Sequence, residues 1–131
     1  MTEVFVDSFY WLALLDPRDP YHQKANQVPR PARMVTTQAV QLEVMNALSP
    51  VRLRGLAVLF WRETTSDPAL VVVPLDNDLL QRGVALYENR PDKSWSLTDC
   101  LSFRVMEDRG ITDALTGDHH FEQAGFRILI Q

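Results

Sequence analysis

The sequence has a single cysteine, no long hydrophobic run and no secretory signal. Cys100 has no second cysteine with which to form an internal disulfide. The N-terminus shows neither a basic segment nor a small-residue cleavage site, so we expect a cytoplasmic protein. The apolar stretch at residues 4–15 is interrupted by Asp7 and is far shorter than the roughly 20 residues of a membrane-spanning helix. No membrane segment is expected.

The sequence also lacks an excess of positive charge. Its net charge is -4 at pH 7, so the chain as a whole does not attract nucleic acid. A substrate that carries phosphate would have to be held by a local basic patch or by bound cations. No repeat, linker or low-complexity segment is present. With 131 residues, 46% of them hydrophobic and 23% charged, the chain has the size and composition of one globular domain, which we place at residues 1–131.

Strand-like and helix-like segments alternate along the chain. Short apolar runs predict strands at residues 4–6, 34–36, 70–73, 111–115 and 127–130. The run at 70–73 is β-branched without alternation, which predicts a strand covered on both faces. Helical spacing fills the intervals, and one helix is expected to begin at Pro20, with Asp19 as its cap. The alternation predicts an α/β fold with a mainly parallel five-stranded sheet and helices on both faces.

Four carboxylates are candidates for one shared site, and three of them lie near strand-to-helix junctions. Asp7 ends the first strand, and Glu43 lies on the helix after the second. Asp99 lies in the first turn of a helix that opens at Ser96, and Asp118 follows the fourth strand. In open α/β sheets, ligands bind at the carboxyl ends of the strands. We therefore expect the four side chains to share one crevice.

Each carboxylate also has a purely structural interpretation. Asp7 or Ser8 could cap the first helix, and Asp118 could cap the last one. Ser96-Leu97-Thr98-Asp99 fits a capping box, and Glu43 could be an exposed helix charge. The spacing of the four along the chain favours the shared site.

Four carboxylates that lie close together require either raised pKa values or a divalent cation. Oxygen ligands favour Mg²⁺ or Mn²⁺, whereas one cysteine and three histidines without a ligand spacing argue against zinc. His119 and His120 are adjacent on a predicted helix, point in different directions and do not make a chelating pair. Ions held by carboxylates can bridge to a phosphodiester and activate water, so an acidic protein could still cut RNA or DNA.

Aromatic and basic side chains near the carboxylates are candidates for substrate contact. Lys93 and Trp95, in the loop that leads to Asp99, are the strongest of these. The other aromatic candidates could stack on bases but are more typical of a core or an interface, and they are Tyr10, Trp11 and Trp61.

These motifs together resemble the PIN-domain ribonucleases, most closely the VapC-like toxins. The matching segments are VFVDS ending at Ser8, Glu43 on its helix, DKSWSLTDC at 92–100 and TGDHHFEQAGF at 116–126. The resemblance covers essentially the whole chain and is most specific over residues 87–126. It implies that Asp7, Glu43, Asp99 and Asp118 bind Mg²⁺ or Mn²⁺ and support hydrolysis of single-stranded RNA. It also implies that Thr116 orients a ligand or water, and we count Ser8 as a second supporting residue.

The resemblance further implies partners. Members of the family typically form homodimers and, as toxins, are silenced by a small antitoxin whose C-terminal segment enters the active groove. The first helix, with Phe9, Trp11 and Leu12, and residues 56–61 offer more apolar surface than one sheet face needs. We expect a dimer partner or an antitoxin to cover that surface.

Other functions are consistent with parts of the pattern. A PIN-domain nuclease could act in RNA processing or turnover without an antitoxin. A phosphohydrolase with Asp7 as nucleophile is disfavoured, because position 9 is Phe9 and no second aspartate stands there. A binding module of the phospho-receiver type does not account for Glu43 and Asp118.

Overall fold

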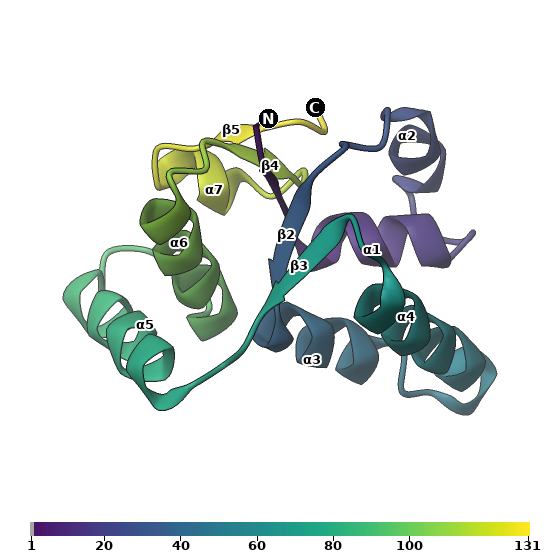
Figure 1. Cartoon of the computed structure of the whole chain (residues 1–131), viewed down its shortest axis with the longest axis horizontal. Coiled ribbons are helices and arrows are strands. Elements are labelled where there is room, and N and C mark those ends of the chain that lie inside the picture. Colours follow the sequence, from purple (N-terminus) through teal and green to yellow (C-terminus); the bar gives the residue numbers. More distant parts are fainter. Residues whose placement is uncertain (1) are drawn as a thin grey trace.

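The computed structural model describes residues 2–131 and contains one five-stranded parallel sheet in the order β3-β2-β1-β4-β5 (Figure 1). The strands are β1 (Val4–Val6), β2 (Met34–Thr37), β3 (Leu70–Val73), β4 (Asp113–Leu115) and β5 (Arg127–Ile128). The helices are α1 (Ser8–Leu15), α2 (His22–Gln27), α3 (Gln38–Ala47), α4 (Arg54–Ser66), α5 (Asn77–Asn89), α6 (Leu97–Arg109) and α7 (His119–Gln123), with a short 3₁₀ turn η1 (Val51–Leu53) before α4. The predicted α/β class and sheet are confirmed.

The first strand lies at the centre of the sheet. Phe5 pairs with Val35 of β2 on one side and with Ala114 of β4 on the other, and all three side chains are fully buried. The chain moves outward from β1 to β2 and β3, then returns to the other side of β1 to form β4. The carboxyl end of β1 is therefore the point where the strand order reverses, and such points are where α/β proteins bind ligands.

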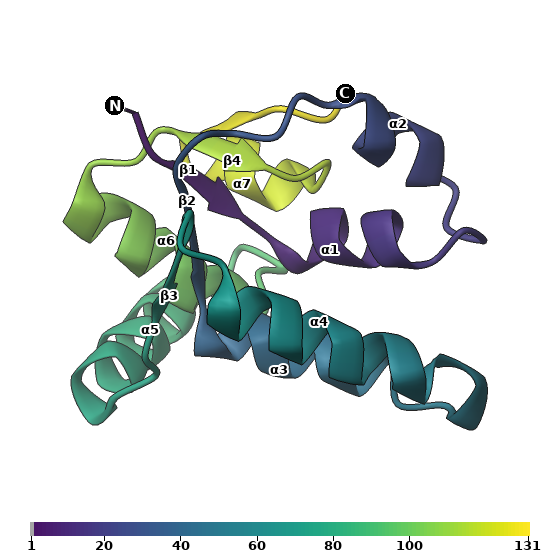
Figure 2. The ribbon, with the colours of Figure 1, turned by 45° about the vertical axis from the view of Figure 1, so that its right-hand side comes forward.

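Helices lie on both sides of this sheet. Figure 1 shows α5 and α6 on its left and α1, α2 and α4 on its right. Figure 2 shows α3 and α4 side by side, with α1 running above them. None of the helices within residues 2–131 has both the length and the apolar character required to cross a lipid bilayer.

Most of the helices begin where their capping residues predict. The Thr37 hydroxyl accepts the N–H of Val40, and the Asp76 carboxylate accepts the N–H of Leu79. These bonds satisfy N–H groups that have no partner inside the helix. Helix α6 ends at Gly110, whose φ of 66° is the left-handed conformation that glycine adopts readily.

Two predictions about individual elements are wrong. The helix expected to begin at Pro20 begins at His22, because the Asp19 carboxylate accepts the N–H of Tyr21 at 2.8 Å and forms a separate turn. Strand β3 is not covered on both faces, because it is the edge strand and Val71 is 42% exposed. An apolar β-branched run looks the same at the edge of a sheet as at its centre.

Aromatic packing fixes the position of the two C-terminal helices. Phe103 of α6 contacts Phe121 of α7 edge to face, with ring centroids 5.0 Å apart. Trp95 packs against Phe103 at the same centroid distance, and Phe121 lies 6.2 Å from Phe5 of β1. These contacts join α6 and α7 to the central strand.

Candidate active site

The four predicted carboxylates lie at the carboxyl edge of the sheet, and side-chain contacts connect them. The Thr116 hydroxyl, just after β4, donates to Asp7 Oδ2 at 2.9 Å. The Ser8 hydroxyl donates to Glu43 Oε1 and lies 3.5 Å from Asp7 Oδ1. On the other side of the site, His120 Nδ1 lies 2.9 Å from Asp99 Oδ2 and 3.5 Å from Asp118 Oδ1. Asp7 and Asp99 are close enough for the negative charge of Asp99 to raise the pKa of Asp7.

Asp7 is the most deeply buried of the four, with 3% of its surface exposed. It follows β1 directly, so the sheet surrounds it. Burial raises the pKa of Asp7 to about 7, and the negative charges of Asp99 and Glu43 act in the same direction. The hydrogen bond from Thr116 opposes this rise but does not cancel it. The surroundings of Asp7 therefore favour its protonated form.

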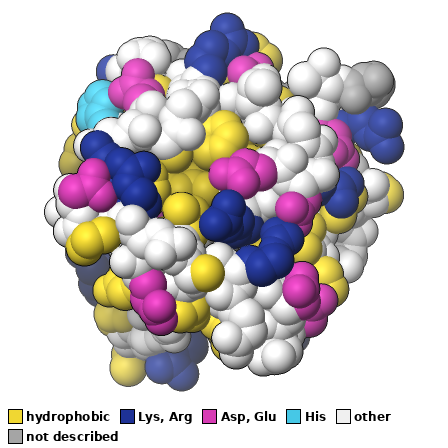
Figure 3. Space-filling model, turned by 90° about the vertical axis from the view of Figure 1, so that its left-hand side faces the viewer, with side chains coloured by type: hydrophobic (Ala, Val, Ile, Leu, Met, Phe, Trp, Pro, Cys, Tyr) yellow, Lys and Arg dark blue, Asp and Glu magenta, His cyan; other side chains and the backbone are white. Residues whose placement is uncertain are grey.

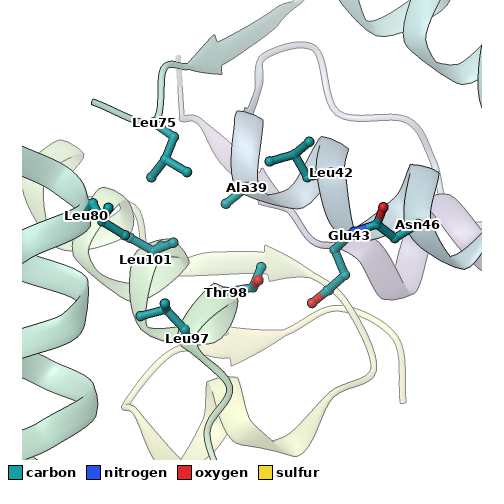
Figure 4. A pocket seen from close by; sticks show the side chains of 9 residues that line it. All are labelled: Ala39, Leu42, Glu43, Asn46, Leu75, Leu80, Leu97, Thr98 and Leu101. Atoms are coloured by element: carbon teal, nitrogen blue, oxygen red, sulfur yellow. The ribbon is translucent and has the colours of Figure 1, made fainter. Parts of the chain in front are cut away.

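Glu43 is not a free helix charge. It is half-buried in the middle of α3, where the Ser8 hydroxyl from α1 binds its carboxylate. Figure 4 shows Glu43 pointing toward Thr98 at one side of a cavity of about 320 Å³ between α3, α5 and α6. The remainder of this cavity is mostly apolar and is lined by Ala39, Leu42, Asn46, Leu75, Leu80, Leu97 and Leu101.

Asp99 has the predicted structural role. Its Oδ2 accepts the N–H of Ser96 at 3.0 Å, and its own N–H donates to the Ser96 hydroxyl, so the capping box is present. Burial raises the pKa of Asp99, while the bonds from Ser96 and His120 lower it. The capping bond uses one carboxylate oxygen and leaves Oδ1 for another partner.

Asp118 likewise has the predicted structural role. It caps α7, and its Oδ1 accepts the N–H of His120 at 2.9 Å. Its own N–H donates to the Thr116 hydroxyl at 3.1 Å. Thr116 therefore binds Asp7 with its hydrogen and Asp118 with its oxygen, and it joins the two strand ends that carry these carboxylates.

His120 is a member of this cluster that sequence reasoning missed. The two histidines do point in different directions, since the His119 side chain is 77% exposed and bonds to Glu122. His120 instead turns toward Asp99 and Asp118, and ligand atoms of these three residues all lie within 4.8 Å of one another. The sequence does place His120 two residues after the predicted helix cap Asp118, and a cap carboxylate commonly accepts the N–H of that residue.

The two predicted substrate-contact residues differ in environment. Trp95 is 6% exposed, its ring lies under the Arg90 guanidinium at 5.0 Å, and its indole N–H donates to Gln123. Trp95 also lines the hollow that contains Lys93, so its contact with substrate stays a prediction. Lys93 lines a hollow of about 580 Å³ together with Tyr87, and it stays a candidate for contact with phosphate.

The other aromatic candidates differ in how exposed they are. Tyr10 and Trp11 are buried, as the core interpretation predicts, and Trp11 packs on Phe60 at 5.5 Å. Trp11 therefore offers none of the surface expected for a partner, whereas Trp61 of α4 is 43% exposed. Its exposed apolar neighbours on α4 are Val58 and Leu59.

The donor set fits a hard divalent cation. Within residues 2–131, no protein group hydrogen-bonds to Asp99 Oδ1, Asp118 Oδ2 or Glu43 Oε2. Free carboxylate oxygens are the ligands that Mg²⁺ and Mn²⁺ prefer. The face formed by α5 and α6 carries side chains of both charge signs around an apolar centre (Figure 3), so it has no broad basic surface that could hold phosphate instead.

Comparison with known proteins gives consistent matches over nearly the whole chain. The PIN domain family matches residues 4–127. The 23S rRNA-specific endonuclease VapC20 of two Mycobacterium tuberculosis strains is 26% identical over 125 residues, which cover 94% of this chain and 95% of the relative.

Solved structures agree with this match. The crystal structure of M. tuberculosis VapC20, described as a sarcin-ricin loop cleaving toxin, superimposes with a TM-score of 0.87 at 26% identity, covering 94% of this chain and 95% of that one. FitAcB from Neisseria gonorrhoeae superimposes with a TM-score of 0.65 at 10% identity and 95% coverage of both chains, which shows a shared fold.

Proposed function

The chain belongs to the PIN-domain family, and we propose that it is an endoribonuclease that depends on Mg²⁺ or Mn²⁺ and cuts single-stranded RNA as the toxin of a toxin–antitoxin pair. One observation carries this proposal. Four carboxylates from separate elements meet at the switch point of the sheet, and the buried Asp7 has its pKa raised to about 7. A divalent cation offsets the mutual repulsion that such a group otherwise produces.

The relatives support RNA as the substrate class. VapC20 is named as an endonuclease that acts on 23S rRNA, and it matches this chain at 26% identity along nearly its full length. The acidic net charge of this chain is consistent with such a substrate if bound cations or a local basic group contact the phosphate. We infer that Lys93, in the loop that leads to Asp99, contributes a further phosphate contact.

The carboxylates Asp7, Glu43, Asp99 and Asp118 would hold the cation. When bound, the cation lowers the pKa of a bound water and stabilises the negative charge that develops on the phosphate oxygens. Asp7 must give up its proton for the site to fill, and its pKa of about 7 makes this possible at neutral pH. The backbone bonds to Asp99 and Asp118 hold these two carboxylates in fixed orientations.

The hydroxyl residues Ser8 and Thr116 serve as supports. Thr116 contacts both Asp7 and Asp118, and Ser8 binds Glu43. Each hydroxyl restrains a carboxylate rotamer, which keeps the cluster arranged for binding before the cation arrives.

A cleavage assay on varied single-stranded RNAs tests the proposal. The wild type is expected to cleave with Mg²⁺ or Mn²⁺ and to be inactive in EDTA, and Asp7→Asn is expected to be inactive with either ion. Asp78→Asn is the matched control, because that side chain is 81% exposed on α5, outside the site. Undiminished cleavage in EDTA, after elemental analysis shows that metal is absent, would rule out the mechanism.

An antitoxin partner and a homodimer are part of the same proposal. The toxin relative supports the antitoxin, and the exposed Val58, Leu59 and Trp61 on α4 provide apolar surface for a protein partner. A segment that supplies an arginine to the carboxylates could displace the cation through charge-assisted hydrogen bonds. We expect a homodimer that co-purifies with the product of a small neighbouring gene and loses its ribonuclease activity on binding. A monomer that is harmless when expressed alone would favour RNA processing instead.

A further inference from the structure

His120 connects two carboxylates that lie on different elements. Its Nδ1 is 2.9 Å from Asp99 Oδ2, at the start of α6, and 3.5 Å from Asp118 Oδ1, after β4. Its backbone N–H donates to the same Asp118 oxygen at 2.9 Å. One residue therefore contacts both carboxylates, and it contacts Asp118 twice.

The oxygens that His120 contacts already accept backbone hydrogen bonds. Asp99 Oδ2 also accepts the Ser96 N–H, and Asp118 Oδ1 accepts the N–H of His120 itself. Within the described residues, Asp99 Oδ1 and Asp118 Oδ2 accept no bond from the protein. The imidazole thus contacts, in each carboxylate, the oxygen that already accepts a bond, and the other oxygens remain available to a cation.

We propose that His120 is a positioning residue that clamps Asp99 and Asp118 through Nδ1–H, so that their free oxygens are held at the spacing a divalent cation requires. The inference rests on the proposed function, since it assumes that these carboxylates bind the cation. It differs from direct ligation, in which Nδ1 itself would coordinate the ion. It also differs from a purely structural role in α7.

Electrostatics explains why such a clamp is needed. Asp118 lies close enough to Asp99 for its negative charge to raise the pKa of Asp99, so the two carboxylates repel each other. A donor between them offsets this repulsion while the cation is absent. Outer hydrogen-bond donors of this kind fix the orientation of metal-binding side chains, and their loss typically weakens metal binding roughly 10–100-fold.

His119 provides a matched control on the same helix. Its side chain is 77% exposed, and within residues 2–131 it bonds to Glu122 and to none of the four site carboxylates. Replacing His119 with alanine removes an imidazole from α7 without touching the clamp.

The test is Mn²⁺ affinity, measured from the electron paramagnetic resonance signal of free Mn²⁺, on wild type, His120→Ala, His120→Asn and His119→Ala. The Nδ2 amide of an asparagine occupies the place of imidazole Nδ1 and keeps the donor. We expect His120→Ala to weaken Mn²⁺ affinity roughly 10–100-fold, His120→Asn to recover most of that loss, and His119→Ala to match the wild type. Thermal melting in EDTA verifies that each variant is folded.

The other outcomes overturn the clamp. Wild-type affinity in His120→Ala shows that the residue does not position the ligands, and equal losses in His120→Ala and His120→Asn show ligation by the imidazole. In both cases the nuclease proposal stands if the wild type binds Mn²⁺ and cleaves RNA. A wild type that is folded and binds no Mn²⁺ overturns the clamp and the proposed metal-dependent function together.

Discussion

Replacing Asp7 with asparagine is expected to abolish metal-dependent cleavage and yet make the metal-free protein more stable. The carboxyl group is 3% exposed, and burial raises its pKa from 3.8 to about 7. At about 1.4 kcal/mol for each tenfold change in proton affinity, the ionised group destabilises the fold by about 4 kcal/mol above pH 7. An amide carries no charge and avoids this penalty at every pH.

The asparagine also fits the hydrogen bonds around it. Its Oδ1 can accept the Thr116 hydroxyl, which now lies 2.9 Å from Asp7 Oδ2. Its Nδ2 can donate to the Ser8 hydroxyl oxygen, which is 3.5 Å from Asp7 Oδ1 and gives its own hydrogen to Glu43. The substitution therefore leaves no buried polar atom at this position without a partner.

The sign of the pH dependence follows from where each state holds the proton. The folded chain keeps the Asp7 proton up to about pH 7, whereas the unfolded chain loses it near pH 3.8. Folding takes up a proton between these values, so the contribution of Asp7 to stability is complete below the lower value and is lost as the pH rises to the upper one. The stability difference between Asp7→Asn and the wild type should therefore be largest at pH 8 and nearly absent at pH 4.

Thermal or urea unfolding in EDTA at several pH values measures this difference. We expect Asp7→Asn to be more stable by about 4 kcal/mol at pH 8, which corresponds to a rise of roughly 15 °C in melting temperature for a chain of this size. Asp78→Asn, at an exposed carboxylate, should change stability by no more than about 0.5 kcal/mol. A less stable Asp7→Asn at pH 8, or a stability gain that does not vary with pH, would refute the reasoning.

Three further predictions address metal binding, capping and loop geometry. Mn²⁺ at about 100 times its dissociation constant should stabilise the wild type by about 2.7 kcal/mol in thermal melts and leave Asp7→Asn unchanged. Asp99→Asn keeps the shape of a cap, so it should lose at most about 1 kcal/mol in unfolding and all of its cleavage activity, and normal turnover would remove Asp99 from the site. A Cβ at Gly117 would lie 2.6 Å from the Phe9 ring, so Gly117→Ala should lose about 1–3 kcal/mol of unfolding free energy and most of its cleavage activity. Gly55→Ala, where a Cβ would meet no atom within 4 Å, should keep its stability in the same melts.

Local sequence was sufficient to predict most elements and the members of the acidic group. The apolar run that ends on Asp7 marks the buried strand β1. Capping residues such as Asp76 and Ser96 fix the starts of their helices through bonds between residues a few positions apart. Such bonds depend on short-range geometry, which the order of residue types specifies. Because all five strands are parallel, their carboxyl ends lie at one edge of the sheet, and this places Asp7 and Asp118 near each other, whereas Glu43 and Asp99 come from helices.

Tertiary structure alone decided how these groups touch. Asp7 and Thr116 are 109 positions apart, and their hydrogen bond exists because β1 and β4 pair as neighbours. The same long-range packing buries Trp95 against Phe103, exposes Val71 at an edge and turns His120 toward Asp99. The burial that raises the pKa of Asp7 likewise comes from elements distant in the chain. The order of residues therefore specified which groups are present. Their environment and proton affinity depend on how the sheet and its helices pack in the folded protein.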